Sequence, residues 1–211
     1  MNATDAKRTE LAELQARVAQ LESQIADESR PVPFRPKGFY AAYYATTGFL
    51  LGVFGAMASL LFNVVGSTLT GRPPLEIIRA YLTFPLGDQA FTLPETQSNL
   101  MLAIGCCLYL GTGMLLGVPM YLALVRWGEG KSLAAKFVIA TIVALAIWAI
   151  NFYGILSWLQ PAVTKTSAEN LIVNYVPWWV AAATHLVFGW TMVLVYPLGQ
   201  YVAYKQVTEQ S

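Results

Sequence analysis

Residues 134–159, AAKFVIATIVALAIWAINFYGILSWL, decide the fold class of this chain. After Lys136 the stretch carries no charged side chain, and it is longer than the roughly 20 helical residues that cross a hydrocarbon core. Inside a bilayer the backbone must satisfy its own hydrogen bonds, so a single segment of this kind crosses as an α-helix. The stretch therefore predicts a transmembrane helix.

Three further apolar runs share this character, at residues 39–66, 99–125 and 176–203. Together with 134–159 they predict an all-α integral membrane protein whose membrane domain, residues 39–204, is a four-transmembrane-helix bundle. The composition agrees, since 56% of the 211 residues are hydrophobic and 12% are charged, about half the charged fraction of a soluble domain. Residues 205–211 form the remaining tail.

Residues 1–29 precede the membrane domain and hold a heptad pattern, and a proline-rich basic linker follows at 30–38. Apolar side chains recur there at alternating spacings of three and four, at Leu11, Leu14, Val18, Leu21 and Ile25. Such a seam is typical of an amphipathic or coiled-coil helix. A parallel homodimer would place Arg17 opposite Glu22 across the interface. Alternatively, the helix packs on another protein or on its own membrane domain.

The positive charges indicate how the membrane domain is oriented. Four crossings put both termini on one side, where ten of the 13 Lys and Arg residues fall, against Arg72, Arg79 and Lys165 on the other side. Cytoplasmic loops are enriched in Lys and Arg, so both termini and the N-terminal helix are expected in the cytoplasm. The expected location is the inner membrane of a bacterial cell.

The longest connection between spans, residues 67–98, is then expected outside and holds a short helical pattern. Within residues 73–88, PPLEIIRAYLTFPLGD, the side chains of Leu75, Ile78 and Leu82 fall on one helical face. Prolines bound this pattern at both ends. The connection predicts a short interfacial helix, which either caps the bundle or docks on a partner protein.

Small residues indicate where the spans pack. Gly48 and Gly52 form a GxxxG motif in the first span, extended by Gly55, and Gly113 and Gly117 form a second motif in the second span. Glycines at this spacing let two helix backbones approach closely. We expect these faces to pack against each other or against another subunit.

His185 is the only histidine of the chain and lies within the fourth span. Ionisable residues inside a bilayer are costly and mark candidate functional sites. Asn151 is expected at a similar depth on the third span, beside Trp148 and Tyr153. These four side chains form a candidate site for a quinone or a lipid headgroup. In the alternative, His185 and Asn151 only hydrogen-bond across helices and stabilise the bundle.

The chain has few residues that could support metal binding, cofactor binding or catalysis. Cys106 and Cys107 are adjacent and point about 100° apart on a helix, which disfavours a metal site shared with His185. A haem would need a second ligand, from a methionine or a second subunit. The sequence has none of the metalloprotease, serine hydrolase or phosphate-loop motifs. We therefore expect no cofactor and no enzymatic activity.

The remaining features favour a non-catalytic accessory or assembly subunit of a larger membrane complex, respiratory complexes among the candidates. Its expected partners are the bilayer and other membrane subunits, or a second copy through the N-terminal helix. A net charge of +1 gives no reason to expect nucleic acid. Two alternatives stay open: a small homo-oligomeric channel or transporter, and an electron-transfer subunit that binds quinone, lipid or haem through His185.

Overall fold

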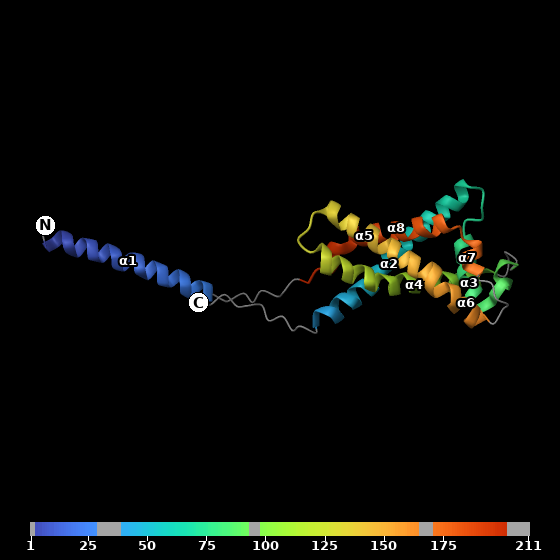
Figure 1. Cartoon of the computed structure of the whole chain (residues 1–211), viewed down its shortest axis with the longest axis horizontal. Helices are drawn as coiled ribbons and strands as arrows, with labels where there is room; N and C mark the ends of the chain where they lie inside the picture. Colours follow the sequence, from blue (N-terminus) through green and yellow to red (C-terminus); the bar gives the residue numbers. More distant parts are fainter. Residues whose placement is uncertain (1–2, 29–38, 93–97, 165–170, 202–211) are drawn as a thin grey trace. The chain divides into compact units, whose positions relative to one another are not determined.

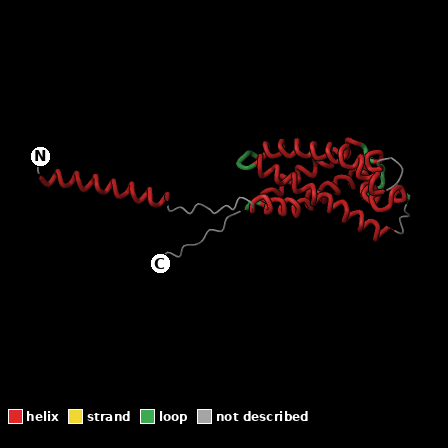
Figure 2. Tube along the Cα trace, turned by 60° about the horizontal axis from the view of Figure 1, so that its bottom comes forward, coloured by secondary structure: helices red, strands yellow, loops and turns green. Residues whose placement is uncertain are grey.

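The computed structural model describes residues 3–28, 39–92, 98–164 and 171–201. The chain divides into two compact units, an N-terminal unit and a membrane unit, and the membrane unit spans Gly38–Val202. Every regular element among the described residues is a helix, and no strand occurs there (Figure 2). The all-α fold class is confirmed.

The N-terminal unit contains helix α1, Ala3–Glu28, which covers the predicted heptad pattern. The five seam side chains, from Leu11 to Ile25, have exposed fractions between 44% for Leu21 and 64% for Ile25. The predicted helix is therefore present, and its apolar seam lies at the surface of its own unit. Its pairing in a coiled coil stays a prediction.

Four helical stretches of the membrane unit are long and apolar enough to cross a bilayer, as predicted. The first two are single helices, α2 (Phe39–Leu69) and α4 (Ser98–Gly128). The third runs from Leu133 to Val163 and the fourth from Trp178 to Gly199. The fourth-span prediction began at residue 176, but helix α8 (Trp178–Val195) starts after Pro177.

The third and fourth spans each change their helix type along their length. The third consists of α5 (Leu133–Ala149), the π-helical segment η3 (Ile150–Ile155) and α6 (Leu156–Thr164). The fourth passes from α8 into the 3₁₀ turn η4 (Tyr196–Gly199). Pro197 has no backbone N–H to donate, which explains why the α-helical pattern stops just before it.

The chain enters and leaves the membrane unit at the same end of the bundle (Figure 1). The rings of Tyr43, early in α2, and Tyr201, after η4, meet edge to face with their centroids 5.5 Å apart. At the opposite end lie α3 (Glu76–Leu86), α6 and α7 (Leu171–Tyr175). We call this second end the capped end.

Helices α2 and α4 pack backbone to backbone through the two predicted glycine motifs. A Cβ atom added to Gly48 would lie 2.7 Å from the carbonyl oxygen of Gly117, and one added to Gly52 would lie 2.5 Å from that of Gly113. Neither position has room for a side chain. A Cβ on Gly55 would instead meet the ring of Phe188 on α8, at 2.7 Å. The two motifs therefore face each other, and Gly55 faces the fourth span.

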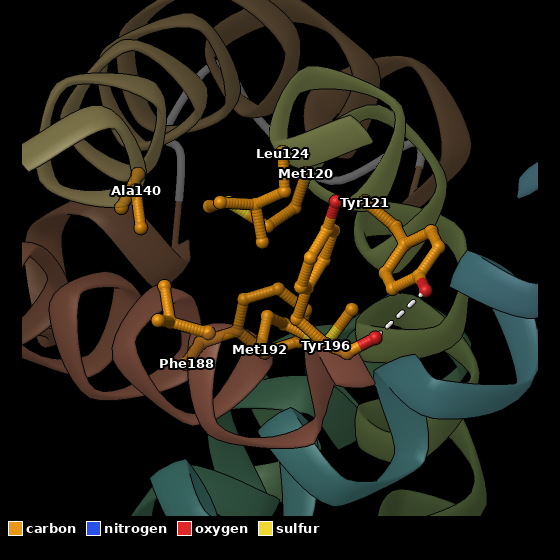
Figure 3. Close-up of a cluster of buried hydrophobic side chains, with 9 residues drawn as sticks. Met120, Tyr121, Leu124, Ala140, Phe188, Met192 and Tyr196 are labelled. Atoms are coloured by element: carbon orange, nitrogen blue, oxygen red, sulfur yellow. Dashed lines mark hydrogen bonds between the residues drawn. The ribbon is translucent and has the colours of Figure 1, made fainter. Parts of the chain in front are cut away.

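The main core lies between α4, α5 and α8, and Figure 3 shows its side chains. Met120, Leu124 and Met192 are fully buried there. The phenol of Tyr121 donates a hydrogen bond to the carbonyl oxygen of Tyr196, at 3.0 Å. The bond satisfies a carbonyl in the turn that ends the fourth span.

Helix α3 covers the capped end with its apolar face turned inward. Ile78, Ala80, Leu82 and Thr83 are buried, and the helix contacts α4, α6 and α7. A Cβ on Gly105 of α4 would lie 2.5 Å from the Ile78 side chain, so this glycine makes room for α3. The short helix predicted in residues 67–98 is thus present and packs against the bundle through its buried face.

Candidate functional site

A layer of polar side chains joins three spans near the capped end. It consists of Ser59 and Asn63 on α2, Tyr109 on α4, and Thr184 and His185 on α8. Ser59 and Asn63 are buried, with exposed fractions of 2% and 5%. Polar groups buried in a membrane protein need partners, so the bonds of this polar layer show what it can do.

The first half of the layer connects α4 to α2. Ser59 Oγ donates to the carbonyl oxygen of Ala56, at 2.9 Å, and lies 2.8 Å from the phenol oxygen of Tyr109. A serine hydroxyl has one proton. Because that proton goes to Ala56, the Tyr109 phenol is the donor in the second bond. The phenol is thereby held in one orientation.

The second half connects α2 to α8. Asn63 Nδ2 donates to the carbonyl oxygen of Ser59, at 2.7 Å, and to Thr184 Oγ1, at 2.9 Å. Thr184 Oγ1 lies 2.8 Å from the carbonyl oxygen of Val180 and 3.3 Å from Asn63 Oδ1. Its single proton therefore favours Val180, which leaves Asn63 Oδ1 with acceptor capacity. In each half of the layer, the series of hydrogen bonds ends at a backbone carbonyl oxygen. This arrangement stabilises helix packing.

His185 is partly buried and is held by its own helix. Its Nδ1 lies 2.8 Å from the carbonyl oxygen of Ala181, one turn earlier. A carbonyl only accepts, so Nδ1 carries the proton, and in the neutral ring Nε2 is the acceptor. The ring lines a small cavity together with Ser59, Tyr81, Tyr109, Thr112 and Thr184.

The cavity beside His185 is small. Its volume is about 30 Å³, which is the space of about one water molecule. A haem macrocycle and a quinone ring are both much larger. The space beside His185 is therefore about that of one water molecule, and ligand binding at His185 stays a prediction.

The other three residues of the predicted site lie in a different environment. Trp148 belongs to an aromatic group in which its ring centroid is 5.6 Å from that of Tyr153 and 6.3 Å from that of Trp178. Tyr153 is 54% exposed, and Asn151 lies within the π-helical segment. None of the three lines the cavity beside His185. The structure brings Trp148 and Tyr153 together but not with His185.

Trp148 also carries a buried polar atom without a partner. Its indole Nε1 is the only buried side-chain nitrogen or oxygen of the described residues that makes no hydrogen bond. The indole packs instead against a second apolar cluster that includes Phe152, Val176 and Ala181. The Trp148 ring therefore contributes to the apolar packing of α5 against α7 and α8.

Gln160 on α6 stabilises the capped end, although the sequence analysis did not single it out. Its side chain is fully buried. Its amide nitrogen donates to Thr83 Oγ1 on α3, and its amide oxygen accepts from the backbone N–H of Ile172 on α7, at 3.0 Å. The sequence could have indicated this role, because a single glutamine in an apolar run needs hydrogen-bond partners inside the bundle.

A larger cavity opens at the capped end, between the end of α2, the start of α3 and the junction of α7 with α8. Its volume is about 320 Å³. Its walls include Phe62, Asn63, Arg72, Glu76, Tyr175 and Trp179. We call it the capped-end cavity. Of its polar residues, sequence reasoning named only Arg72, as a cation on the side away from the termini, because these residues come from segments distant in the chain.

The polar groups of the capped-end cavity interact with one another. Arg72 Nη1 lies 3.8 Å from the Glu76 carboxylate, and Tyr175 forms a side-chain hydrogen bond with Glu76. Burial raises the pKa of the Tyr175 phenol and the Glu76 carboxylate raises it further, whereas Arg79 and Arg72 lower it. The phenol therefore stays protonated at neutral pH and acts as a donor.

No family model, curated protein or solved structure matches this chain. Its function is inferred from its own residues.

Proposed function

We propose that this protein is a non-catalytic accessory or assembly subunit of a larger membrane complex. Both of its termini lie in the cytoplasm of a bacterial cell. The observation that carries the proposal is the exposed apolar seam of α1, from Leu11 to Ile25. A helix with such a seam gains most of its stability by packing against another helix. The seam is therefore the proposed contact with a partner subunit or a second copy.

The use of the buried polar groups supports a non-catalytic role. Ser59, Asn63, Thr184 and Tyr109 direct their protons to one another or to backbone carbonyls. His185 faces a space of about one water molecule. Groups committed to packing in this way stabilise the bundle and are not placed to exchange protons with a substrate.

The charge distribution supports the proposed orientation. The connection between α4 and α5 carries Lys131 and follows Arg126, and Lys136 Nζ lies 4.6 Å from the ring centroid of Tyr196. This places cations at the end where the chain enters and leaves the membrane unit. Arg72 and Arg79 lie at the capped end, and with Lys165 they are the three Lys and Arg residues predicted on that side, against ten on the side of the termini.

Gentle detergent extraction of the full-length protein from its native membrane tests the proposal. Co-migration with different membrane proteins on sizing is the expected result. A variant with Leu14→Glu and Leu21→Glu places two charges in the seam and should release those proteins. The matched control, Ala16→Glu with Ala19→Glu, adds the same charges to the opposite face of α1 and should keep them bound.

Two results would contradict the proposal. A pure homo-oligomer in the native extract, dispersed by the seam charges, supports the channel or transporter alternative. Release of the partners by the control variant as well would show that charge on α1, and not its seam, disturbs the assembly.

A further inference from the structure

We propose that the capped-end cavity binds one anionic phospholipid, with its phosphate on Arg72 and the start of its acyl chains against Phe62 and Trp179. This site is distinct from the candidate site around His185. It also goes beyond the proposed subunit role, because lipid binding here does not depend on a partner protein.

The size and lining of the cavity fit the head region of a lipid. A volume of about 320 Å³ falls at the lower end of the range typical of ligand pockets. The wall is mixed, with apolar side chains such as Ile77 and Val180 beside Asn63, Arg72 and Glu76. A few polar groups in an apolar wall suit an amphipathic ligand.

Arg72 has the donors that a phosphate needs. Its side chain is 51% exposed, and its nearest carboxylate, on Glu76, is 3.8 Å away, too far for a hydrogen bond. Among the described residues, Glu76 holds the one carboxylate within ion-pair distance of this guanidinium. A guanidinium binds phosphate oxygens through two parallel N–H donors, which makes Arg72 the phosphate-binding group.

The charges around the cavity favour a single negative charge. Arg72 and Arg79 both act on Tyr175 as nearby cations, and Glu76 is the nearby anion. Among the described residues that act on Tyr175, two cations and one carboxylate give a net charge of +1. A phospholipid with one net negative charge neutralises it, whereas the choline group of a zwitterionic lipid would bring a further cation toward Arg72 and Arg79.

The position of the cavity favours a lipid over a soluble anion. Phe62 on α2 and Trp179 on α8 line it and are 38% and 57% exposed on membrane-spanning stretches. Asn63 lies six residues before the end of α2, or about 9 Å below it along the helix axis. The cavity thus extends from a polar mouth at Arg72 into the depth where acyl chains lie, and it borders the surface that faces lipid.

Native mass spectrometry of the purified full-length protein in mild detergent tests the inference. An equimolar mixture of phosphatidylglycerol and phosphatidylcholine with the same acyl chains is added. The expected result is one retained phosphatidylglycerol per chain and little phosphatidylcholine. Arg72→Gln should lower the retained phosphatidylglycerol about tenfold, because it removes a charge-assisted pair.

A second variant fills the cavity and has a matched control. Gly66 lines the cavity, and a Cβ added there meets nothing within 4 Å. Gly66→Phe should therefore fold and abolish retention of the lipid. Gly111 on α4 likewise has nothing within 4 Å of an added Cβ and does not line the cavity. Gly111→Phe should retain phosphatidylglycerol at the wild-type level.

Three results would overturn the inference. The first is equal retention of both lipids, which indicates annular lipid without a site. The second is unchanged phosphatidylglycerol retention in Arg72→Gln, a surface substitution that does not threaten folding. The third is displacement of the lipid by an excess of inorganic phosphate, which indicates a site for a soluble anion. Since the readout is lipid bound to the isolated chain, each result leaves the proposed subunit role untouched.

Discussion

Asn63 on α2 donates a hydrogen bond to Thr184 on α8, at 2.9 Å, and joins two residues that are 121 positions apart in the sequence. The same pair borders both cavities, because Asn63 lines the capped-end cavity and Thr184 lines the small cavity beside His185. The bond therefore holds the first and fourth spans together beside both cavities.

Replacing Asn63 with leucine should lower the free energy of unfolding in detergent by about 1 kcal/mol, the usual scale for a hydrogen bond between membrane helices. The change removes the bonds to Ser59 and Thr184 and keeps a similar side-chain volume. Unfolding by titration with a denaturing detergent measures it. Thr68→Val serves as the control, since Thr68 is exposed and bonds only within its own helix, so stability should not change.

Gly52→Ala should destabilise the protein by about 1–3 kcal/mol, because overpacking forces two helices apart. The added methyl group would lie 2.5 Å from the Gly113 carbonyl oxygen and 2.9 Å from Met114 Cα. Gly111→Ala meets no such contact and should be neutral or slightly stabilising. Equal thermal stability of the two variants would contradict the close packing of α2 on α4.

Gln160→Leu should loosen the capped end. It leaves the buried N–H of Ile172 without its acceptor, which costs about 1–3 kcal/mol, and it removes the donor to Thr83. Hydrogen exchange should accelerate in α3 and α7 and stay unchanged in α5. Ser157→Ala on α6 is the control, because that exposed hydroxyl bonds only to the carbonyl of Gly154. Acceleration in the control as well would assign the effect to α6 itself.

Tyr81 on α3 makes stability depend on alkaline pH. Burial raises the pKa of its phenol to about 12, although the hydrogen bond to Thr112 lowers the pKa in part. In the unfolded chain the pKa is about 10. The unfolded state therefore releases its proton first, and stability declines as the pH rises from about 10 to about 12. Tyr81→Phe should flatten part of this decline in unfolding midpoints measured across that range. An identical decline in both proteins would contradict the burial of this phenol.

The absorption spectrum of the purified protein should contain no Soret band. The cavity of about 30 Å³ beside His185 is far too small for haem. The spectrum is recorded on protein extracted in mild detergent. A Soret band that disappears in His185→Ala would show that the space around His185 rearranges to admit the macrocycle.

Much of the helix packing was predictable from residue type and spacing. Gly48, Gly52, Gly113 and Gly117 were predicted to lie at close helix contacts, either with each other or with another subunit, and the structure shows that they face each other between α2 and α4. The contact between α5 and α8 uses Ala140, Ala144 and Gly189 in the same way. Alanines are common throughout apolar runs, which explains why this second interface was not recognised.

The candidate site was less predictable. Counting residues from the span ends placed His185 and Asn151 at a similar depth, but depth does not say which way a side chain points. The direction follows from the rotation of each helix, and the π-helical segment at Ile150–Ile155 changes that rotation within the third span. The capped-end cavity was missed because Arg72 and Tyr175 meet there only through the packing of α3 and α7.

Residue type and spacing along the chain were enough to predict four membrane crossings, a heptad helix before them, and glycine faces for close packing on two of the spans. These properties follow from the local cost of placing polar backbone and charge in hydrocarbon and from residue periodicity. Three contacts could be seen only in the folded chain: Asn63 meets Thr184, Gln160 joins α3 to α7, and a cavity forms beside Arg72. Such contacts depend on the relative rotation of helices distant in the chain, which many weak packing interactions set together.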